Sequence, residues 1–103
     1  MTEKYKKVIL IDLDGVLNNY NGNFDKDFIP EIKTGAREFL EKLSRDYEIK
    51  IFTTRNRLMS SKWLIQNKLD KFVTDVTNVK EPAFLHIDDR LHSQNPTHTL
   101  RHF

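Results

Sequence analysis

An unbroken apolar run that ends in two carboxylates constrains this chain more than any other part of its sequence. Val8-Ile9-Leu10-Ile11 is followed directly by Asp12-Leu13-Asp14-Gly15. Consecutive apolar residues are typical of a strand covered on both faces, as in a parallel sheet. Alternate residues of a strand share a face, so Asp12 and Asp14 begin on the same side. Because burying two carboxylates is costly, we expect a divalent cation at the end of this strand.

Length and composition indicate one domain and exclude several classes of site. The chain has 103 residues, no cysteine and a net charge of +2. Without cysteine there are no disulfides, thiolate metal sites or cysteine nucleophiles, and so small a charge gives no bulk electrostatic support for nucleic-acid binding. No apolar run is long enough to span a membrane, and no signal peptide is recognisable. We expect a single cytoplasmic domain over residues 1–103 that makes no membrane contact.

The order of the predicted elements favours an α/β fold with a mainly parallel central sheet. Strands are expected at 7–13, 48–53, 72–76 and 83–87, and helices at 34–45 and 57–69. Thr34 and Asn56 are the expected N-caps, and residues 16–31 form a turn-rich excursion or small hairpin. Strands that alternate with helices predict right-handed crossovers and a Rossmann-like three-layer sandwich.

Apolar residues at helical spacing predict the buried face of each helix. The predicted stripes are Ala36, Phe39, Leu40 and Leu43 in the first helix, and Leu58, Ile65 and Leu69 in the second, with Met59 and Trp63 beside it.

Polar groups follow the predicted strands, where parallel α/β sheets bind their ligands. They are Asp12 and Asp14 after the first strand, Thr53, Thr54 and Arg55 after the second, Lys80 before the last, and Asp88 and Asp89 after it. This set suits phosphoryl transfer to an aspartate. One carboxylate attacks phosphorus, a cation screens the two anions, a hydroxyl and an amine hold the phosphate, and a second carboxylate carries the proton. Mg²⁺ is the expected cation, since it prefers hard oxygen ligands.

Over residues 7–90 the chain resembles the haloacid dehalogenase (HAD) superfamily of phosphohydrolases. The four motifs of that family are matched by Ile11-Asp12-Leu13-Asp14-Gly15, Ile51-Phe52-Thr53, Lys80 and Phe84-Leu85-His86-Ile87-Asp88-Asp89. The segments between the motifs are too short for a cap domain, so the chain is similar to capless members with an open site. The resemblance implies a magnesium-dependent phosphatase acting on a phosphorylated small molecule or a nucleic-acid end.

The resemblance also implies a role for each carboxylate. Asp12 would be the nucleophile and a magnesium ligand. Asp14 would be the general acid/base, with its backbone carbonyl also on the metal. Asp88 would bind magnesium directly or through water, and Asp89 would share that role or orient Lys80.

The phosphate would be held by a hydroxyl and an amine beside the flap formed by residues 16–31. Thr53 is the expected hydroxyl, with Thr54 as its rival. Lys80 is favoured over Lys68 because it lies in a loop on the correct side of the sheet.

Three further residues near the motifs have their own expected roles. Arg55 either binds substrate or is a surface charge. His86 alternates with apolar neighbours and is expected to be a packed core histidine. Asn18 is expected to stabilise a turn.

Residues 91–103 form a polar tail with little periodic apolar content, where the family usually continues into further structure. A minimal fold, a homo-oligomer that covers the short C-terminal end, and a shortened chain are the alternatives. Two other functions stay open: a catalytically weak or inactive domain that binds phosphate or a partner, and a receiver-like phosphoacceptor domain. The Asp-x-Asp spacing argues against the receiver, which carries its acidic pair and its phosphoacceptor after different strands.

Overall fold

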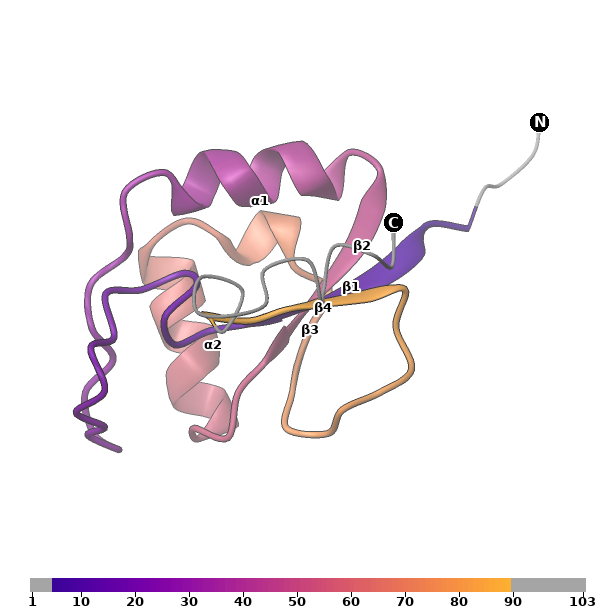
Figure 1. The fold of residues 1–103 in the computed structure, drawn as a ribbon. Coiled ribbons are helices and arrows are strands. Elements are labelled where there is room, and N and C mark those ends of the chain that lie inside the picture. The colour runs from indigo at the N-terminus through magenta and orange to yellow at the C-terminus, as the bar shows by residue number, and fades with distance from the viewer. Residues whose placement is uncertain (1–4, 90–103) are drawn as a thin grey trace.

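A four-stranded parallel sheet and two α-helices make up the part of the chain that this computed structural model describes, residues 5–89 (Figure 1). The elements are β1 (Lys7–Asp12), α1 (Ala36–Ser44), β2 (Tyr47–Phe52), α2 (Arg57–Gln66), the 3₁₀ helix η1 (Asp70–Phe72), β3 (Asp75–Thr77) and β4 (Leu85–Ile87). The strand order is β3-β2-β1-β4. The expected α/β class with a parallel sheet is confirmed, and the fold is compatible with a Rossmann-like arrangement.

The register brings the ends of the strands to one level. Asp12 pairs with Phe52, and Phe52 pairs with Thr77. On the other side of β1, Ile11 pairs with Ile87. The residues that follow β1, β2 and β4 therefore leave the sheet at the same edge, which is where parallel α/β sheets bind ligands.

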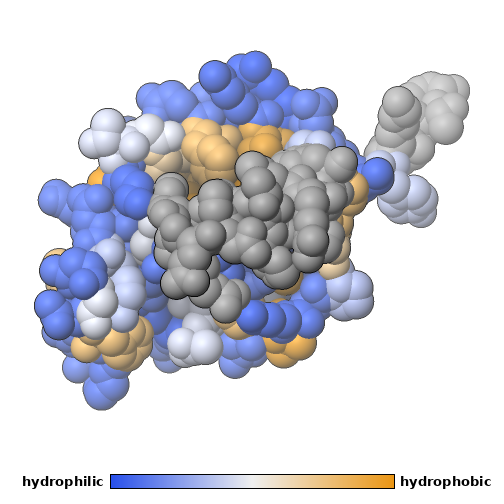
Figure 2. All heavy atoms as spheres, viewed as in Figure 1, coloured by the Kyte–Doolittle hydropathy of each residue, from blue (hydrophilic) through white to orange (hydrophobic). Residues whose placement is uncertain are grey.

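One hydrophobic core lies between a single face of the sheet and both helices. Its buried members are Ile9, Ile11, Ile49, Ile51, Val76 and Leu85 from the strands, Ala36 and Leu40 from α1, and Trp63 and Leu64 from α2. Two successive right-handed crossovers in one direction place both helices on the same face. The outer side of α1 is hydrophilic (Figure 2), as expected for an amphipathic helix on such a core.

The second face of the sheet carries a loop in place of a helix within residues 5–89. Residues 78–84 connect β3 to β4 on the side of the sheet opposite α1 (Figure 1). Lys50 Nζ lies 2.9 Å from Glu81 Oε1 and holds this loop against β2. The connection is shorter than the dozen or more residues that a helical crossover requires. The expected three-layer arrangement is thus not formed by helices in this part of the chain.

One of the two predicted helix caps is confirmed. Asn56 Oδ1 accepts a hydrogen bond from the backbone N–H of Met59 at 2.9 Å, which caps α2. The prediction for Thr34 was wrong, because Gly35 is the N-cap of α1 and makes no side-chain cap bond. Gly35 has a φ of 87°, a left-handed conformation that favours glycine, and the helix begins only after it.

The predicted buried face is confirmed for α1. Of the residues predicted for the second helix, Leu69 and Trp63 are buried and Met59 packs against the core, but the prediction was wrong for Leu58 and Ile65. Leu58 and Ile65 are 65% and 58% exposed, whereas Trp63, Leu64 and Ser60 are buried. Ser60 tolerates burial because its hydroxyl donates to the Asn56 carbonyl at 2.9 Å. The Trp63 indole N–H donates to the Pro30 carbonyl at 3.1 Å, so the ring packs against the core with its polar atom satisfied.

Two other predicted segments are shifted or only partly formed. The strand expected at 72–76 begins at Asp75, because Asp70–Phe72 forms η1. The excursion at 16–31 contains one antiparallel bridge, between Asn18 and Ile32, rather than a full hairpin. The predicted tail at 91–103 lies outside the described residues.

Candidate metal and phosphate site at the carboxyl edge of the sheet

Two carboxylates and an imidazole converge where β1 and β4 end. Ligand atoms of Asp12, His86 and Asp88 all lie within 4.8 Å of one another. The register explains this grouping: His86 pairs with Leu10, which shares a face with Asp12, and Asp88 follows Ile87, the partner of Ile11. Asp88 is 8% exposed. The structure thus brings together two of the four predicted metal ligands and adds a histidine to them.

His86 contacts the predicted nucleophile directly. Its Nε2 lies 2.7 Å from Asp12 Oδ1, and its ring makes an edge contact with the Phe52 ring at a centroid distance of 5.6 Å. The His86 side chain is 24% exposed, so the expectation of a packed core histidine was wrong. The signal was present in the sequence, because His86 is two residues before Asp88 in an extended segment and must share its face.

Asp14 is held by a buried arginine. Arg55 Nε lies 3.1 and 3.0 Å from the two carboxylate oxygens of Asp14, and Asn18 Nδ2 donates to Asp14 Oδ1 at 3.0 Å. The Arg55 side chain is only 1% exposed. The expected surface charge is therefore wrong for Arg55, and its other expected role, substrate binding, stays a prediction. Asn18 stabilises its turn as predicted and also orients Asp14.

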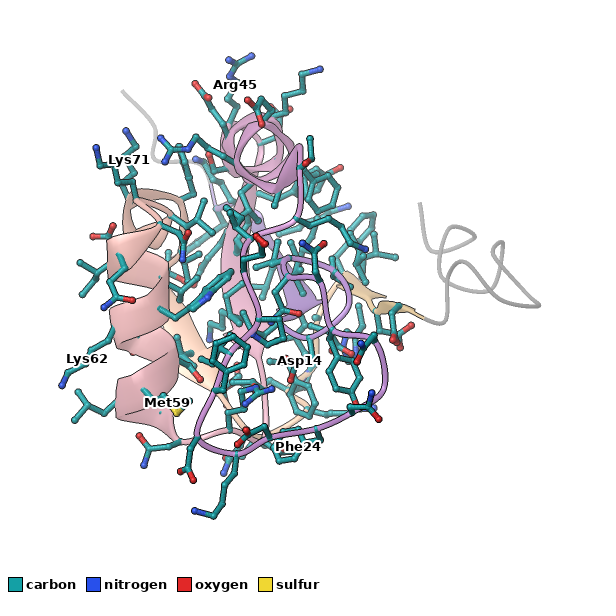
Figure 3. All side chains as sticks on the ribbon, turned by 90° about the vertical axis from the view of Figure 1, so that its left-hand side faces the viewer. Asp14, Phe24, Arg45, Met59, Lys62 and Lys71 are labelled. Atoms are coloured by element: carbon teal, nitrogen blue, oxygen red, sulfur yellow. The ribbon has the colours of Figure 1, made fainter. Side chains whose placement is uncertain are left out.

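The flap supplies the other contacts of the Arg55 guanidinium. Its Nη1 donates to the Asp25 carbonyl at 2.7 Å, and its Cζ lies 4.5 Å from the centroid of the Phe24 ring. Among the described residues, Arg55 Nη2 is a buried nitrogen without a hydrogen-bond partner. Figure 3 shows Asp14 near the middle of this edge of the molecule, with Phe24 close by. Arg55 therefore contacts both Asp14, the predicted general acid/base, and the flap.

Asp89 packs against Gly15 and is not a member of the metal group. Gly15 has a φ of 86°, and a Cβ added there would lie 2.8 Å from both Cβ and Oδ2 of Asp89. The Gly15 N–H donates to Asn18 Oδ1 at 3.1 Å, and its carbonyl accepts from Lys33 Nζ at 2.7 Å. A glycine is needed here for both its conformation and its lack of a side chain.

Of the two hydroxyl candidates, Thr53 is buried at the end of β2 and Thr54 is exposed. Thr53 Oγ1 accepts a hydrogen bond from the backbone N–H of Arg55 at 3.1 Å. This bond uses the oxygen as an acceptor and leaves the hydroxyl proton to be donated. Thr53 is therefore the better placed of the two to bind a phosphate oxygen.

Lys80 lies on the same face of the sheet as the metal group. Its Nζ is 5.5 Å from the centroid of Phe52, the ring that also contacts His86. The Lys50–Glu81 ion pair anchors its loop, and the hydrogen bond that Lys50 donates to Glu81 raises the pKa of Lys50 above its ordinary value of 10.5. The rival Lys68 lies just beyond the end of α2, where its backbone N–H bonds to the Ile65 carbonyl.

A hollow of about 580 Å³ opens beside Thr53 at the ends of β2 and β3. Its lining includes Thr53, Thr54, Arg57, Asp75, Thr77 and Glu81. Hollows of this size accommodate small organic molecules. The hollow therefore lies next to Thr53, the predicted phosphate-binding hydroxyl.

Comparison with known proteins does not assign the chain to a family. No protein-family model matches it, and neither do any curated protein or solved structure. The resemblance to the HAD superfamily therefore rests on the motif residues and stays a prediction. Neither helix in residues 5–89 has the length and apolar content needed to cross a bilayer.

Proposed function

We propose that the protein is a HAD-type phosphatase that requires a divalent cation and hydrolyses a phosphate monoester through an aspartyl-phosphate. One observation carries the proposal. Asp12 and Asp88 lie with His86 within 4.8 Å at the carboxyl edge of a parallel sheet, and Asp14, two residues after Asp12, is held by Arg55. We retain a cytoplasmic location as a prediction from the sequence.

The donor set fits a divalent cation. Two carboxylate oxygens and an imidazole nitrogen are ordinary ligands of such ions. Asp12 and Asp88 would hold the ion, which the resemblance predicts to be Mg²⁺, with the Asp14 carbonyl as a further predicted ligand. The bound cation would screen the repulsion between an attacking carboxylate and a phosphate.

In the proposed reaction each bond change has an assigned residue. An oxygen of Asp12 forms a bond to phosphorus as the ester P–O bond breaks, and Asp14 gives its proton to the leaving oxygen. Water then attacks the phosphorus of the aspartyl-phosphate, Asp14 takes a proton from that water, and phosphate and free Asp12 result. The Thr53 hydroxyl and the Lys80 amine hold the non-bridging oxygens.

Arg55 is a positioning residue in this scheme. It binds Asp14 Oδ1 together with Asn18, whereas Asp14 Oδ2 receives only the Arg55 Nε hydrogen bond. Oδ2 is therefore the oxygen with more free lone-pair capacity to exchange a proton.

A second function, phosphate or partner binding without turnover, is favoured by the state of the two carboxylates. Asp12 is hydrogen-bonded to His86, and Asp14 is paired with Arg55. A catalytic cycle must loosen both contacts, whereas a binding domain needs to loosen neither.

Hydrolysis assays with single substitutions separate the two functions. The purified protein is incubated with Mg²⁺ or Mn²⁺ and p-nitrophenyl phosphate, and with 5′- and 3′-phosphorylated oligonucleotides. We expect Asp12→Asn to abolish turnover and Asp14→Asn to reduce it by about 100-fold or more. Asp70→Asn, an exposed carboxylate in η1, is the matched control and should retain activity.

Two results would count against the phosphatase. Full turnover by Asp12→Asn rules out that residue as the nucleophile. Absence of turnover on every substrate, with phosphate binding that depends on Thr53 and Lys80, supports the binding domain instead.

A further inference from the structure

We infer that His86 is itself a metal ligand, and that the centre prefers a cation that accepts nitrogen, such as Mn²⁺, Co²⁺ or Zn²⁺, over Mg²⁺. The inference rests on the proposed function only in taking Asp12 and Asp88 as ligands. It departs from the magnesium that the resemblance implies, because the resemblance gives His86, which lies within the fourth motif, no role as a metal ligand.

The position of the imidazole supports coordination. His86 Nε2 points at the metal-binding candidate Asp12, with 2.7 Å between Nε2 and Oδ1. A ring nitrogen of His86 lies within 4.8 Å of a ligand atom of Asp88. The edge contact with Phe52 limits rotation of the ring. Asp12 and His86 both belong to the hydrogen-bonded strands β1 and β4, so the backbone fixes the spacing of their donors.

The chemistry of the donors then selects the cation. Mg²⁺ takes oxygen ligands in a near-ideal octahedron and dehydrates reluctantly. Imidazole suits later transition metals, and the affinity of a mixed nitrogen and oxygen site rises along the series from Mn²⁺ towards Cu²⁺. One nitrogen with two carboxylates is therefore a poorer match for Mg²⁺ than three carboxylates would be.

The competing role for His86 is to orient Asp12 by a hydrogen bond without touching the metal. Loss of such an outer partner typically lowers metal affinity by about 10- to 100-fold. It acts on the carboxylate, so the loss falls on Mg²⁺ and on transition metals alike. The ratio of the two affinities, rather than either affinity alone, separates the two roles.

Calorimetric titration of the full chain with Co²⁺ and with Mg²⁺, without substrate, measures that ratio. We expect the wild type to bind Co²⁺ more tightly than Mg²⁺. His86→Gln should lower Co²⁺ affinity by about 100-fold and Mg²⁺ affinity by less than about 10-fold. His86→Asp should keep Mg²⁺ binding and lose the preference for Co²⁺, which shows that the site survives the substitution.

The other histidines provide the control, since the chain has 4 in all. Replacement of His92, His98 and His102 together by glutamine should leave the ratio unchanged. Pulsed EPR of the Mn²⁺-loaded protein gives an independent readout: a coupling to a coordinated ¹⁴N is expected in the wild type and in the triple variant, and it should vanish in His86→Gln.

Several results would overturn the inference. The first two are equal losses of Co²⁺ and Mg²⁺ affinity in His86→Gln, and no ¹⁴N coupling in the wild type. The others are loss of the preference for Co²⁺ in the triple variant of His92, His98 and His102, and no binding of either cation by the wild type. These readouts involve no turnover. If the protein is inactive but His86→Gln changes the ratio of Co²⁺ to Mg²⁺ affinity as expected, only the phosphatase is refuted. If the protein is active but His86→Gln leaves that ratio unchanged, only the role of His86 is refuted.

Discussion

Replacement of Arg55 by methionine tests whether the site is organised around a buried ion pair. The change removes the Nε contacts to Asp14 at 3.0 and 3.1 Å, the Nη1 bond to the Asp25 carbonyl at 2.7 Å, and the stacking on Phe24. Methionine keeps much of the apolar stem, so the loss is mainly electrostatic.

The contacts allow the cost to be estimated. A hydrogen bond to a charged group contributes about 1.5–3 kcal/mol, and a cation–π contact about 0.5–2 kcal/mol. Two effects reduce the sum: the variant no longer buries the unpaired Arg55 Nη2, and Asp14, whose side chain is 22% exposed, regains water. We therefore expect the free energy of unfolding to fall by about 3 kcal/mol, the lower end of the range for breaking a buried pair.

Urea denaturation followed by circular dichroism measures this cost. Arg57→Met is the matched control, because Arg57 pairs with Asp75 at 2.7 Å with its side chain 72% exposed, and such pairs contribute at most about 1 kcal/mol. A double-mutant cycle of Arg55→Met with Asp14→Asn should give a coupling of about 1–2 kcal/mol. Equal free energies of unfolding for Arg55→Met and Arg57→Met, or additive effects of Arg55→Met and Asp14→Asn, would contradict a stabilising buried ion pair.

The remaining predictions concern a glycine and a surface ion pair. Gly15→Ala should destabilise the protein by about 1 kcal/mol more than Gly35→Ala in chemical denaturation. Both glycines have a left-handed φ, 86° at Gly15 and 87° at Gly35, but of the two only Gly15 faces a side chain, that of Asp89. Equal losses of stability in the two variants would contradict this prediction. The raised pKa of Lys50 means that its pairing with Glu81 stabilises the fold below pH 10.5 and is lost as the pH rises through the raised value. The melting temperature of the wild type should therefore fall more steeply above about pH 10.5 than that of Glu81→Gln, and parallel curves would show that the pair does not stabilise the fold.

The parallel sheet and the edge that carries the site were predictable because their signals are local. The apolar run of β1 indicates a buried strand, and residues placed after parallel strands meet at one edge. The Asn56 cap was predictable for the same reason, since a capping side chain bonds to a backbone N–H only three residues away.

The partners of the site residues were not predictable in this way. The Arg55–Asp14 pair joins residues 41 apart in sequence, and the His86–Asp12 contact joins residues 74 apart. Local sequence placed Arg55 after a strand and His86 inside one, but it contained no information on which strand lies beside which. The prediction failed for Leu58 and Ile65 of α2 for a related reason, because the weak apolar pattern of this helix did not show which side would meet the sheet.

The sequence by itself determined the α/β class, the carboxylates at the strand ends and the chemistry that those groups favour, because each depends on residue type and short-range spacing. Only the tertiary structure decided that His86 joins Asp12 and Asp88, that Arg55 is buried against Asp14, and that Asp89 packs on Gly15. The physical reason is the strand order: β4 pairs with β1 rather than with β3, its neighbour in sequence. That pairing sets the imidazole of His86 beside the first carboxylate, Asp12.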